Sequence, residues 1–578
     1  MRDDDKTDLP GWLGLRKIPD LTKARWLGPL LMIGSGLIVG GLFLLALLTA
    51  FILLSSAAFG SLLDDPRSAL GVGGVTVALI GAPFVIWRSV VAQKTVNVTE
   101  QGHITDRINT AVEGLGAEKT VSRIGRIVKV KAPDGHVRQE IKWAGGKLKE
   151  VEGDKIDAEG DWQVFNETLP NLEVRIGAIY ALERIAQDSD RDHVQIMEIL
   201  CAYIRQNAPA PETDDWPVLE MKEGEYDGPL KADWEERLEA FREKQVSAKA
   251  ALRVREDIQV ALTVIGRRSA RQRRLEAGRG KEADFSFDAP FPEYDGPEER
   301  LSPDALDAYL EKLAAWKSDL EDYEGYRLDL RGTDLRGADL AERELQGAKL
   351  NGTYLQGADL VGARLQGAVL WQARLRGSRL RQARLQGADL MRAGLEGVFL
   401  WNAQLQGAKL WEARLQGANL GEARLQGANF AAARLQGVRL LEARLQGAKL
   451  WAARLQGANL RAARLQGAGL AEARLQGAFL GEARFDAHTS LTAAPLRGAA
   501  VRDVDFTTIP QIADHLQGIF GDASVTLPDG HGPGHESWPA HWPSVKLNPR
   551  DFVTQWQAWL KDLETEDPPD PPQPEHPA

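Results

Sequence analysis

Large apolar residues recur at every fifth position from Leu330 to Phe485. These 32 consecutive positions hold 30 Leu and two Phe, and the residue two places before each is Ala in 25 cases. A strict period of five matches neither the 3.6-residue period of an amphipathic helix nor the alternation of a strand. The pattern predicts a solenoid, in which units stack because none can bury its apolar face alone.

A four-sided coil satisfies this period. Each five-residue unit forms one side, with the Leu and the preceding small residue inside and the other three residues in water. Four units make a turn of 20 residues, so 32 units predict eight turns, stacked about 4.8 Å apart as paired strands are. Arg343 occupies a small inner site, where a charged side chain predicts a local distortion.

The run ADLVG-ARLQG-AVLWQ-ARLRG, which begins at Ala358, resembles the pentapeptide-repeat proteins. Their fold is a right-handed quadrilateral β-helix, and the resemblance implies this fold for residues 326–507. The fold class expected for the whole chain is mixed, with the β-helix preceded by a two-helix transmembrane anchor and an α-helical cytoplasmic module.

Two long uncharged runs near the N-terminus predict the anchor. After a tail over residues 1–26, residues 27–93 form a transmembrane hairpin with spans at about 30–54 and 70–88. Six Lys or Arg residues precede the first span, two follow the second and one lies between them. This distribution predicts cytoplasmic termini, and hence a multi-pass protein of the bacterial inner membrane. Gly36 and Gly40 have the spacing of a helix-packing motif, which serves either packing of the two spans or dimerisation.

Residues 94–268 predict a mainly helical cytoplasmic module. Apolar periodicity indicates a helical hairpin between Leu172 and Tyr203, and the segment Ile127–Val130 alternates as a strand does. The module resembles one that precedes the β-helix in membrane-anchored bacterial pentapeptide-repeat proteins, and the resemblance implies no activity.

Two amphipathic helices are expected to pack together on the surface, or alternatively to bind a partner as a hairpin. They lie within Lys231–Gln245 and within Asp304–Tyr323, the second in the charged linker over residues 269–325. A basic cluster between the helices either contacts anionic lipid headgroups or is solvated. Residues 508–578 predict a cap over the open end of the coil at Ile509–Phe520, a further helix, and a disordered tail after Glu566.

Charge is unevenly distributed. The chain has 578 residues and a net charge of −11; residues 326–485 have 24 basic and 13 acidic residues, hence +11, which leaves −22 for the rest. The single cysteine, Cys201, excludes an internal disulfide and is expected to be a buried small residue. No motif for catalysis, a cofactor or a metal ion is evident, so we expect a protein that is not an enzyme.

The residues that face outward from the coil are the candidate binding residues. Arg ladders are predicted on two opposite faces, one including Arg424 and Arg444 and the other Arg414 and Arg434. Glu residues two places before many of these Arg residues predict local compensation, while the alternative is a platform for an anionic partner. A further face aligns four large apolar residues, which the two Arg ladders are expected to adjoin; Trp401 lies opposite. The four are Trp371, Met391, Trp411 and Trp451.

These patterns predict a membrane-anchored scaffold that presents the β-helix for protein–protein interaction. The protein partner is not identified, the bilayer is the second partner, and a homo-oligomer is an alternative. Nucleic acid is disfavoured as a ligand, although the Arg faces leave anionic lipid or nucleic acid as alternatives. A topoisomerase-protecting DNA mimic, known in this family, is also disfavoured, because mimicry needs an acidic rod.

Overall fold

The computed structural model describes residues 102–133, 135–146, 155–222, 224–225, 230, 233–278, 287, 291–293 and 303–565, and positions 41, 44, 48 and 51. The chain forms two compact units, Met1–Asp106 and Arg107–Ala578. In the first unit, positions 41, 44, 48 and 51 and residues 102–106 are helical. The predicted spans, with Gly36 and Gly40, otherwise lie outside the described residues. Within those residues, no helix combines the length and the apolar character that crossing a bilayer requires.

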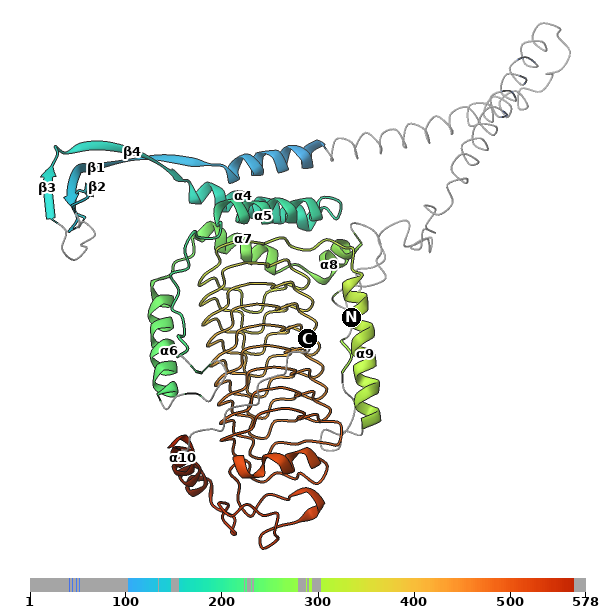
Figure 1. The fold of residues 1–578 in the computed structure, drawn as a ribbon. Helices are drawn as coiled ribbons and strands as arrows, with labels where there is room; N and C mark the ends of the chain where they lie inside the picture. The colour runs from blue at the N-terminus through green and yellow to red at the C-terminus, as the bar shows by residue number, and fades with distance from the viewer. Residues whose placement is uncertain are drawn as a thin grey trace, which may run out of the picture. The chain divides into compact units, whose positions relative to one another are not determined.

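A four-sided β-helix dominates the second unit (Figure 1). Parallel bridges join each side to the side 20 residues later, from Asp329 and Lys349 to Arg464 and Arg484. The Leu and Ala columns are buried inside, as the five-residue period predicted. The N–H of Leu415, for example, donates to the carbonyl of Arg434 at 2.7 Å. The 20-residue turn is therefore confirmed.

The coil has four edges, which turn 416–435 defines. Gly417 lies on edge A, Glu422 on edge B, Gly427 on edge C and Ala432 on edge D. All four have positive φ angles, of 64°, 55°, 64° and 54°. This left-handed conformation is free of strain only for glycine. Glycine nevertheless forms a continuous column only along edges A and C, while edges B and D mostly carry residues with side chains.

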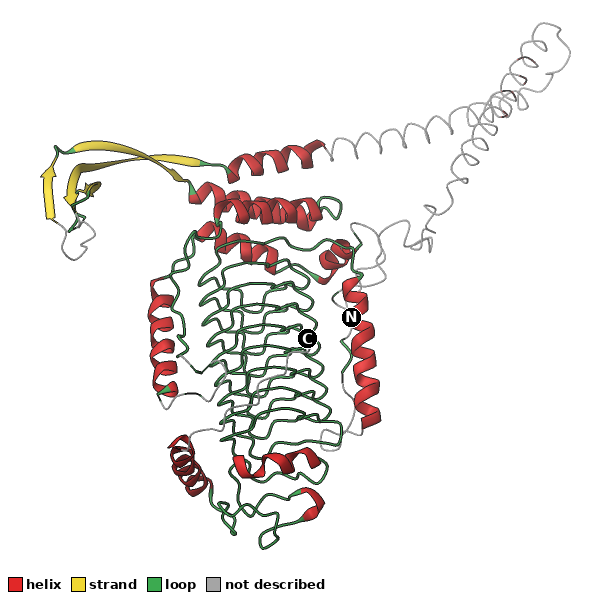
Figure 2. Ribbon diagram, in the orientation of Figure 1, coloured by secondary structure: helices red, strands yellow, loops and turns green. Residues whose placement is uncertain are grey.

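Helices cover the two glycine edges (Figures 1 and 2). Helix α6 (Trp234–Ala251) lies along edge A, and α9 (Pro303–Glu321) lies along edge C. Leu238 of α6 is fully buried over Gly417. Because glycine lacks a Cβ, each column is a shallow groove into which a helix can place large side chains. The two helices therefore pack on the coil, and the expectation that they pack on each other is wrong.

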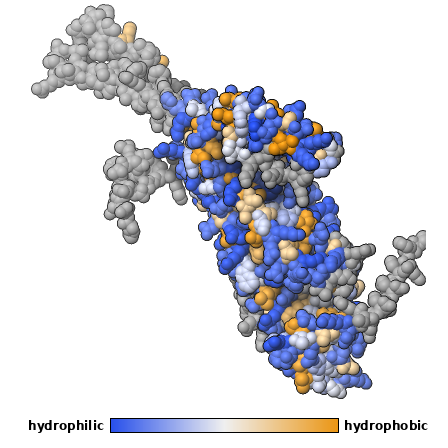
Figure 3. Space-filling view, turned by 90° about the vertical axis from the view of Figure 1, so that its left-hand side faces the viewer, coloured by the Kyte–Doolittle hydropathy of each residue, from blue (hydrophilic) through white to orange (hydrophobic). Residues whose placement is uncertain are grey.

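The Gln residues before the edge glycines are buried by these helices as well. Gln416 is only 5% exposed, and Arg242 of α6 donates to the carbonyl of the adjacent Gly417 at 3.1 Å. The expectation that three of every five residues face water therefore fails along edges A and C. From the side of α6, the surface shows small apolar groups between polar residues (Figure 3).

Four helices close the N-terminal end of the coil. They are α4 (Leu172–Asp188), α5 (His193–Asn207), α7 (Glu256–Gly266) and α8 (Ala270–Ala277). The first turn would expose unpaired backbone N–H groups, and this helical module accepts hydrogen bonds from three of them. The pairs are Asp334 with Ala208 at 2.8 Å, Asp339 with Gln259 at 3.0 Å and Glu344 with Gly266 at 2.8 Å. The module, whose helical hairpin the sequence predicted, is thus the N-terminal cap.

Arg343 causes no distortion of this first turn. Its N–H donates to Leu340 at 3.3 Å, and its carbonyl accepts from Arg364 at 2.9 Å, as at other inner sites. The side chain is half-buried and lies against Gly266, where an added Cβ would be 2.8 Å from the Cβ of Arg343. The predicted distortion is wrong, because the first turn borders α7 instead of another turn.

An antiparallel sheet precedes the helical module. It comprises β1 (Glu118–Lys131), β2 (Val137–Trp143), β3 (Lys155–Glu159) and β4 (Gln163–Pro170). Strand β1 is central, with β2 on one edge and β3 and β4 in succession on the other. The alternation at Ile127–Val130 correctly predicted a strand.

The C-terminal end of the coil is also covered. The short 3₁₀ helix η2 (Pro510–Gly518) places Ile512 against the end of the apolar interior, near Phe506. This confirms the predicted cap. After η3 (Pro528–Gly530), helix α10 (Pro549–Thr565) packs on Phe520 through Phe552 and reaches edge A at Gly498. The predicted disordered tail lies outside the described residues.

Candidate functional site

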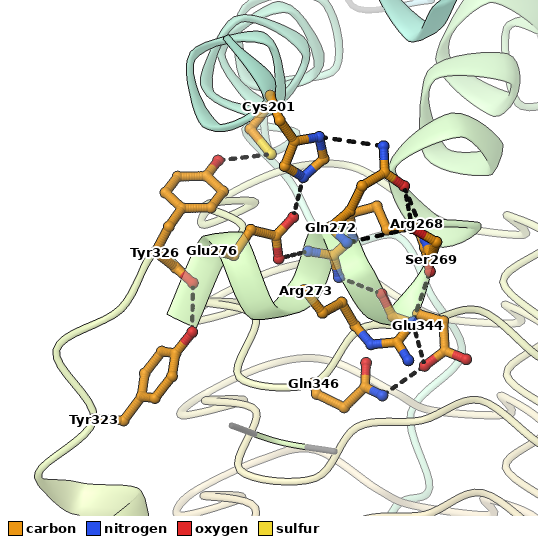
Figure 4. A network of polar contacts seen from close by, with 11 residues as sticks. Cys201, Arg268, Ser269, Gln272, Arg273, Glu276, Tyr323, Tyr326, Glu344 and Gln346 are labelled. Carbon is orange, nitrogen blue, oxygen red and sulfur yellow. Dashed lines mark hydrogen bonds and ion pairs between the residues drawn. The ribbon is translucent and has the colours of Figure 1, made fainter. Parts of the chain in front are cut away.

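A buried polar network joins the helical module to the coil (Figure 4). His193 Nε2 lies 2.8 Å from Glu276 Oε1, and Arg268 pairs with the same carboxylate. Arg268 also donates to the carbonyl of Glu344 in the first turn at 2.6 Å. Burial by itself raises the pKa of Glu276, but Arg268 and His193 hold it below its ordinary value. The side chains of His193, Arg268 and Glu276 are all buried, so the network fastens the two parts together and is closed to substrates.

Cys201 lies beside this network and is chemically quiet. The thiol is fully buried, and burial raises its pKa to about 11. The hydroxyl of Tyr326 donates to Cys201 Sγ at 3.8 Å. Thiolate is the reactive form, so the prediction of a buried structural cysteine is confirmed. Across the described part of the chain, no three His, Cys, Asp or Glu residues are grouped to hold a metal ion.

A second buried cluster, which the sequence patterns did not indicate, surrounds Asp257 at the start of α7. Arg255 Nε donates to its carboxylate at 2.6 Å and the Tyr203 hydroxyl donates to it as well. Arg175 donates to the side-chain oxygen of Asn207 at 2.9 Å. It also donates to the backbone carbonyl of Ala117, just before β1, at 2.9 Å. The cluster therefore ties three helices to the start of the sheet.

The predicted Trp face lies along edge D. Backbone hydrogen bonds connect neighbouring turns there; for example, the N–H of Gln372 donates to Met391 at 3.0 Å. Trp371 and Trp451 are 38% and 51% exposed, whereas Met391 and Trp411 are half-buried. The Arg392 guanidinium lies 5.0 Å from the Trp411 ring centre. The alignment is as predicted, with the greatest exposure at its two ends.

Trp401 lies on edge B, opposite this stripe, as expected. Its ring is half-buried and covers Gly421 in the next turn, where an added Cβ would lie 2.6 Å from the ring. Trp401 therefore packs against the coil.

The two Arg ladders occupy opposite sides of the coil, as predicted. Parallel bridges align Arg414 with Arg434 on the side between edges D and A, and Arg424 with Arg444 on the side between edges B and C. Only the Arg414–Arg434 ladder adjoins the Trp stripe. On the other side of the Trp stripe, between edges C and D, lies a column that includes Lys409. The expectation that both ladders adjoin the stripe is wrong, because two full sides separate residues ten positions apart.

The predicted pairing of Glu412 with Arg414 within a five-residue unit is not observed, and both residues take part in other ion pairs. Most of the ion pairs seen on the coil run between turns or to a segment outside the coil. Examples are Arg392 with Glu412 (2.7 Å), Arg461 with Glu482 (3.0 Å), Arg414 with Glu396 (3.2 Å) and Arg374 with Asp214 (2.7 Å). A stacked turn is only about 4.8 Å away, so long side chains reach across turns.

A polar groove of about 380 Å³ runs along the side between edges B and C. The exposed carboxylates of Glu422, Glu442 and Glu482 line it from edge B, and half-buried Arg residues lie along the side itself. The Arg residues are Arg424, Arg444, Arg464 and the more exposed Arg484. The groove therefore presents two parallel columns of opposite charge.

The repeats match a family model described as pentapeptide repeats. Eight copies are found, in segments between residues 326 and 481. The chain belongs to the pentapeptide-repeat family. A crystal structure of HetL from the cyanobacterium Nostoc, a pentapeptide repeat protein involved in heterocyst differentiation regulation, is 31% identical. That match covers 35% of this chain and 86% of HetL, with a TM-score of 0.18.

Other solved structures also match. QnrB1, a plasmid-mediated fluoroquinolone resistance protein, is 17% identical over 40% of this chain and 95% of its own, with a TM-score of 0.22. A pentapeptide repeat protein of the Arabidopsis thaliana thylakoid lumen is 33% identical over 19% of this chain and 66% of its own, with a TM-score of 0.12. No curated protein is similar enough to match.

Proposed function

We propose that this pentapeptide-repeat protein is a non-enzymatic, membrane-anchored scaffold whose β-helix binds a protein partner in the cytoplasm. The observation that carries the proposal is the unequal covering of the four edges. Helices of the same chain lie along edges A and C, whereas Trp371 and Trp451 on edge D remain substantially exposed. Large indole rings held on a hydrogen-bonded coil lose little conformational entropy when a partner docks.

Charge beside the stripe favours an acidic partner. Arg414 and Arg434 are both half-buried on the adjoining side, and the Lys column borders the stripe on its other side. At the N-terminal end of this Arg ladder, Asp214 already pairs with Arg374. Steering by these cations should weaken as salt concentration rises.

The anchor part of the proposal rests on the two uncharged N-terminal runs and their basic flanks. Reporter fusions after Asp5 and after Ala578 test it in bacterial cells. Both fusions should report the cytoplasm, and fractionation should recover the chain with the inner membrane. A periplasmic signal at either terminus would contradict the two-span arrangement.

Site-specific photo-crosslinking tests the binding face. A photoreactive amino acid at Trp451 should capture one major protein that is not a second copy of this chain, while the same group at Arg461 on edge B should not capture that protein. Replacing Trp411 and Trp451 by Gln should remove a partner captured through a photoreactive group at Met391, with the circular dichroism spectrum unchanged. If the double variant keeps the wild-type crosslinks, edge D is not the binding face.

The DNA-mimic alternative lacks support from charge. A mimic must present anions in place of phosphates, but residues 326–485 carry +11. The Arg residues beside edge D would instead attract nucleic acid or anionic lipid. The test is whether binding of duplex DNA or anionic vesicles is lost in Arg414→Glu and kept in the Trp double variant. That result would favour a nucleic-acid or lipid ligand over a protein partner.

A further inference from the structure

The groove beside edge B has a charge pattern that no other side of the coil repeats. Glu422 and Glu442 on the edge are exposed, and Arg424 and Arg444 on the adjacent side are half-buried. Acidic side chains therefore form a ridge, and basic side chains form the floor next to it. Both columns follow the turns of the coil, since parallel bridges connect Arg424 to Arg444.

The opposite side lacks this pattern although the Arg ladder is the same. The residues of edge D that correspond to the Glu column are Ala432 and Ala452, with Glu only at Glu412 and Glu472. On edge B, Glu422 and Glu442 occupy consecutive turns, and Ala462 separates them from Glu482. Two consecutive turns with a Glu on the edge and an Arg on the adjacent side therefore occur only in the groove beside edge B.

The spacing of the columns selects the kind of partner. Charges along the coil repeat once per turn, about 4.8 Å, whereas side chains on one face of an extended peptide repeat about every 6.8 Å. A peptide would lose register after one or two pairs. Another stacked β-coil has the same spacing and keeps register along its whole length.

Symmetry then decides the orientation of two identical coils. A two-fold axis parallel to the coil axis brings the Glu ridge of each copy opposite the Arg floor of the other, at the same turn. A two-fold axis across the coil would instead place Arg opposite Arg. Complementary charge therefore permits only the parallel arrangement, in which each ridge enters the groove of the partner.

We propose that the groove beside edge B is a self-association surface, through which two copies of this chain form a parallel dimer. Glu422 and Glu442 of one copy pair with Arg424 and Arg444 of the other. This proposal is independent of the binding role proposed for edge D, because the two edges lie on opposite corners of the coil. The parallel orientation places the first turns of both coils at the same end of the dimer.

A charge-swap experiment on the full chain in detergent tests the dimer. One variant carries Arg424→Glu and Arg444→Glu, and the other carries Glu422→Arg and Glu442→Arg. Each alone should be monomeric in sedimentation measurements at concentrations where the wild type is dimeric, with the dissociation constant raised at least tenfold. An equimolar mixture should restore the dimer, because Glu columns then face Arg columns throughout.

A matched control is the variant with Arg414→Glu and Arg434→Glu, which changes the charge equally on the opposite side. It should dimerise as the wild type does. Orientation is read from disulfide formation between a chain with Glu442→Cys and a chain with Arg444→Cys, since the native Cys201 is buried. A monomeric wild type, whatever else the groove binds, would overturn the proposal, and so would a mixture that stays monomeric.

Discussion

The glycine column along edge A provides a test of how α6 is attached. In Gly417→Ala, the new Cβ would lie 2.2 Å from Leu238 Cδ1, whereas at Gly477 nothing lies within 4 Å. The φ angles, 64° and 66°, are nearly equal. Both substitutions therefore cost about 1–2 kcal/mol for the left-handed backbone. Only Gly417→Ala should cost a further 1–3 kcal/mol, roughly, for overpacking.

Hydrogen exchange of the amides of α6 measures this difference, because it reports the free energy of local opening. Protection within Trp234–Ala251 should fall in Gly417→Ala and stay at the wild-type level in Gly477→Ala. In a Leu238→Ala background, the extra cost of Gly417→Ala should disappear, since the clashing methyl group is gone. Equal effects of both glycine substitutions, or an unchanged cost in that background, would refute this account of the groove.

Three further predictions concern the coil and the module. Leu415→Arg should lower the unfolding free energy by several kcal/mol, because it places an unpaired charge inside the coil. Gln416→Arg should lower it by roughly 1–3 kcal/mol, because α6 covers Gln416. Chemical denaturation measures both changes, and a negligible effect of Gln416→Arg would mean that α6 does not pack on this part of edge A. Ala452→Gly should raise the melting temperature by relieving a positive φ, with a net gain of about 0.5–1 kcal/mol because the greater chain entropy of unfolded Gly offsets part of the strain relief. Ala453→Gly, at an inner site, should lower it. The unfolding free energy should fall as pH rises from about 9 towards 11. The folded Cys201 thiol has a pKa of about 11 against an ordinary value of 9.0, so it stays protonated while the unfolded thiol ionises. Cys201→Ala should show a smaller fall, and an equal fall in the two proteins would contradict a raised pKa of Cys201.

The interior of the coil could be predicted from the sequence alone. Burial of Leu415 and of every equivalent Leu depends only on its place within a repeated unit and on pairing with identical neighbouring turns. The same repetition predicted the alignment of the Trp residues and of the Arg ladders. These features needed no knowledge of distant segments, because each turn supplies the surroundings of the next.

The covering of the coil was decided by the tertiary structure. Gln-Gly corners have the composition of solvated turns, so nothing within the repeat indicated that α6 and α9 would bury Gln416 and its equivalents. The sequence did contain one signal, the glycine columns on opposite edges. The turns of a helix rise about 5.4 Å, close to the spacing of about 4.8 Å between strands, so successive turns of a helix can meet successive glycines of a column. Which helix meets which edge depends on long-range packing.

The ends of the coil and its ion pairs were also decided by the tertiary structure. The five-residue period could not reveal that the first turn borders a helical cap, so Arg343 was expected to distort a site where it instead lies beside Gly266. The partners of Glu412 and Arg414 were also misassigned, because each pairs with a residue in a neighbouring turn. Sequence periodicity therefore determined the coil itself, and its edges, ends and ion pairs were decided by contacts between segments far apart in the sequence.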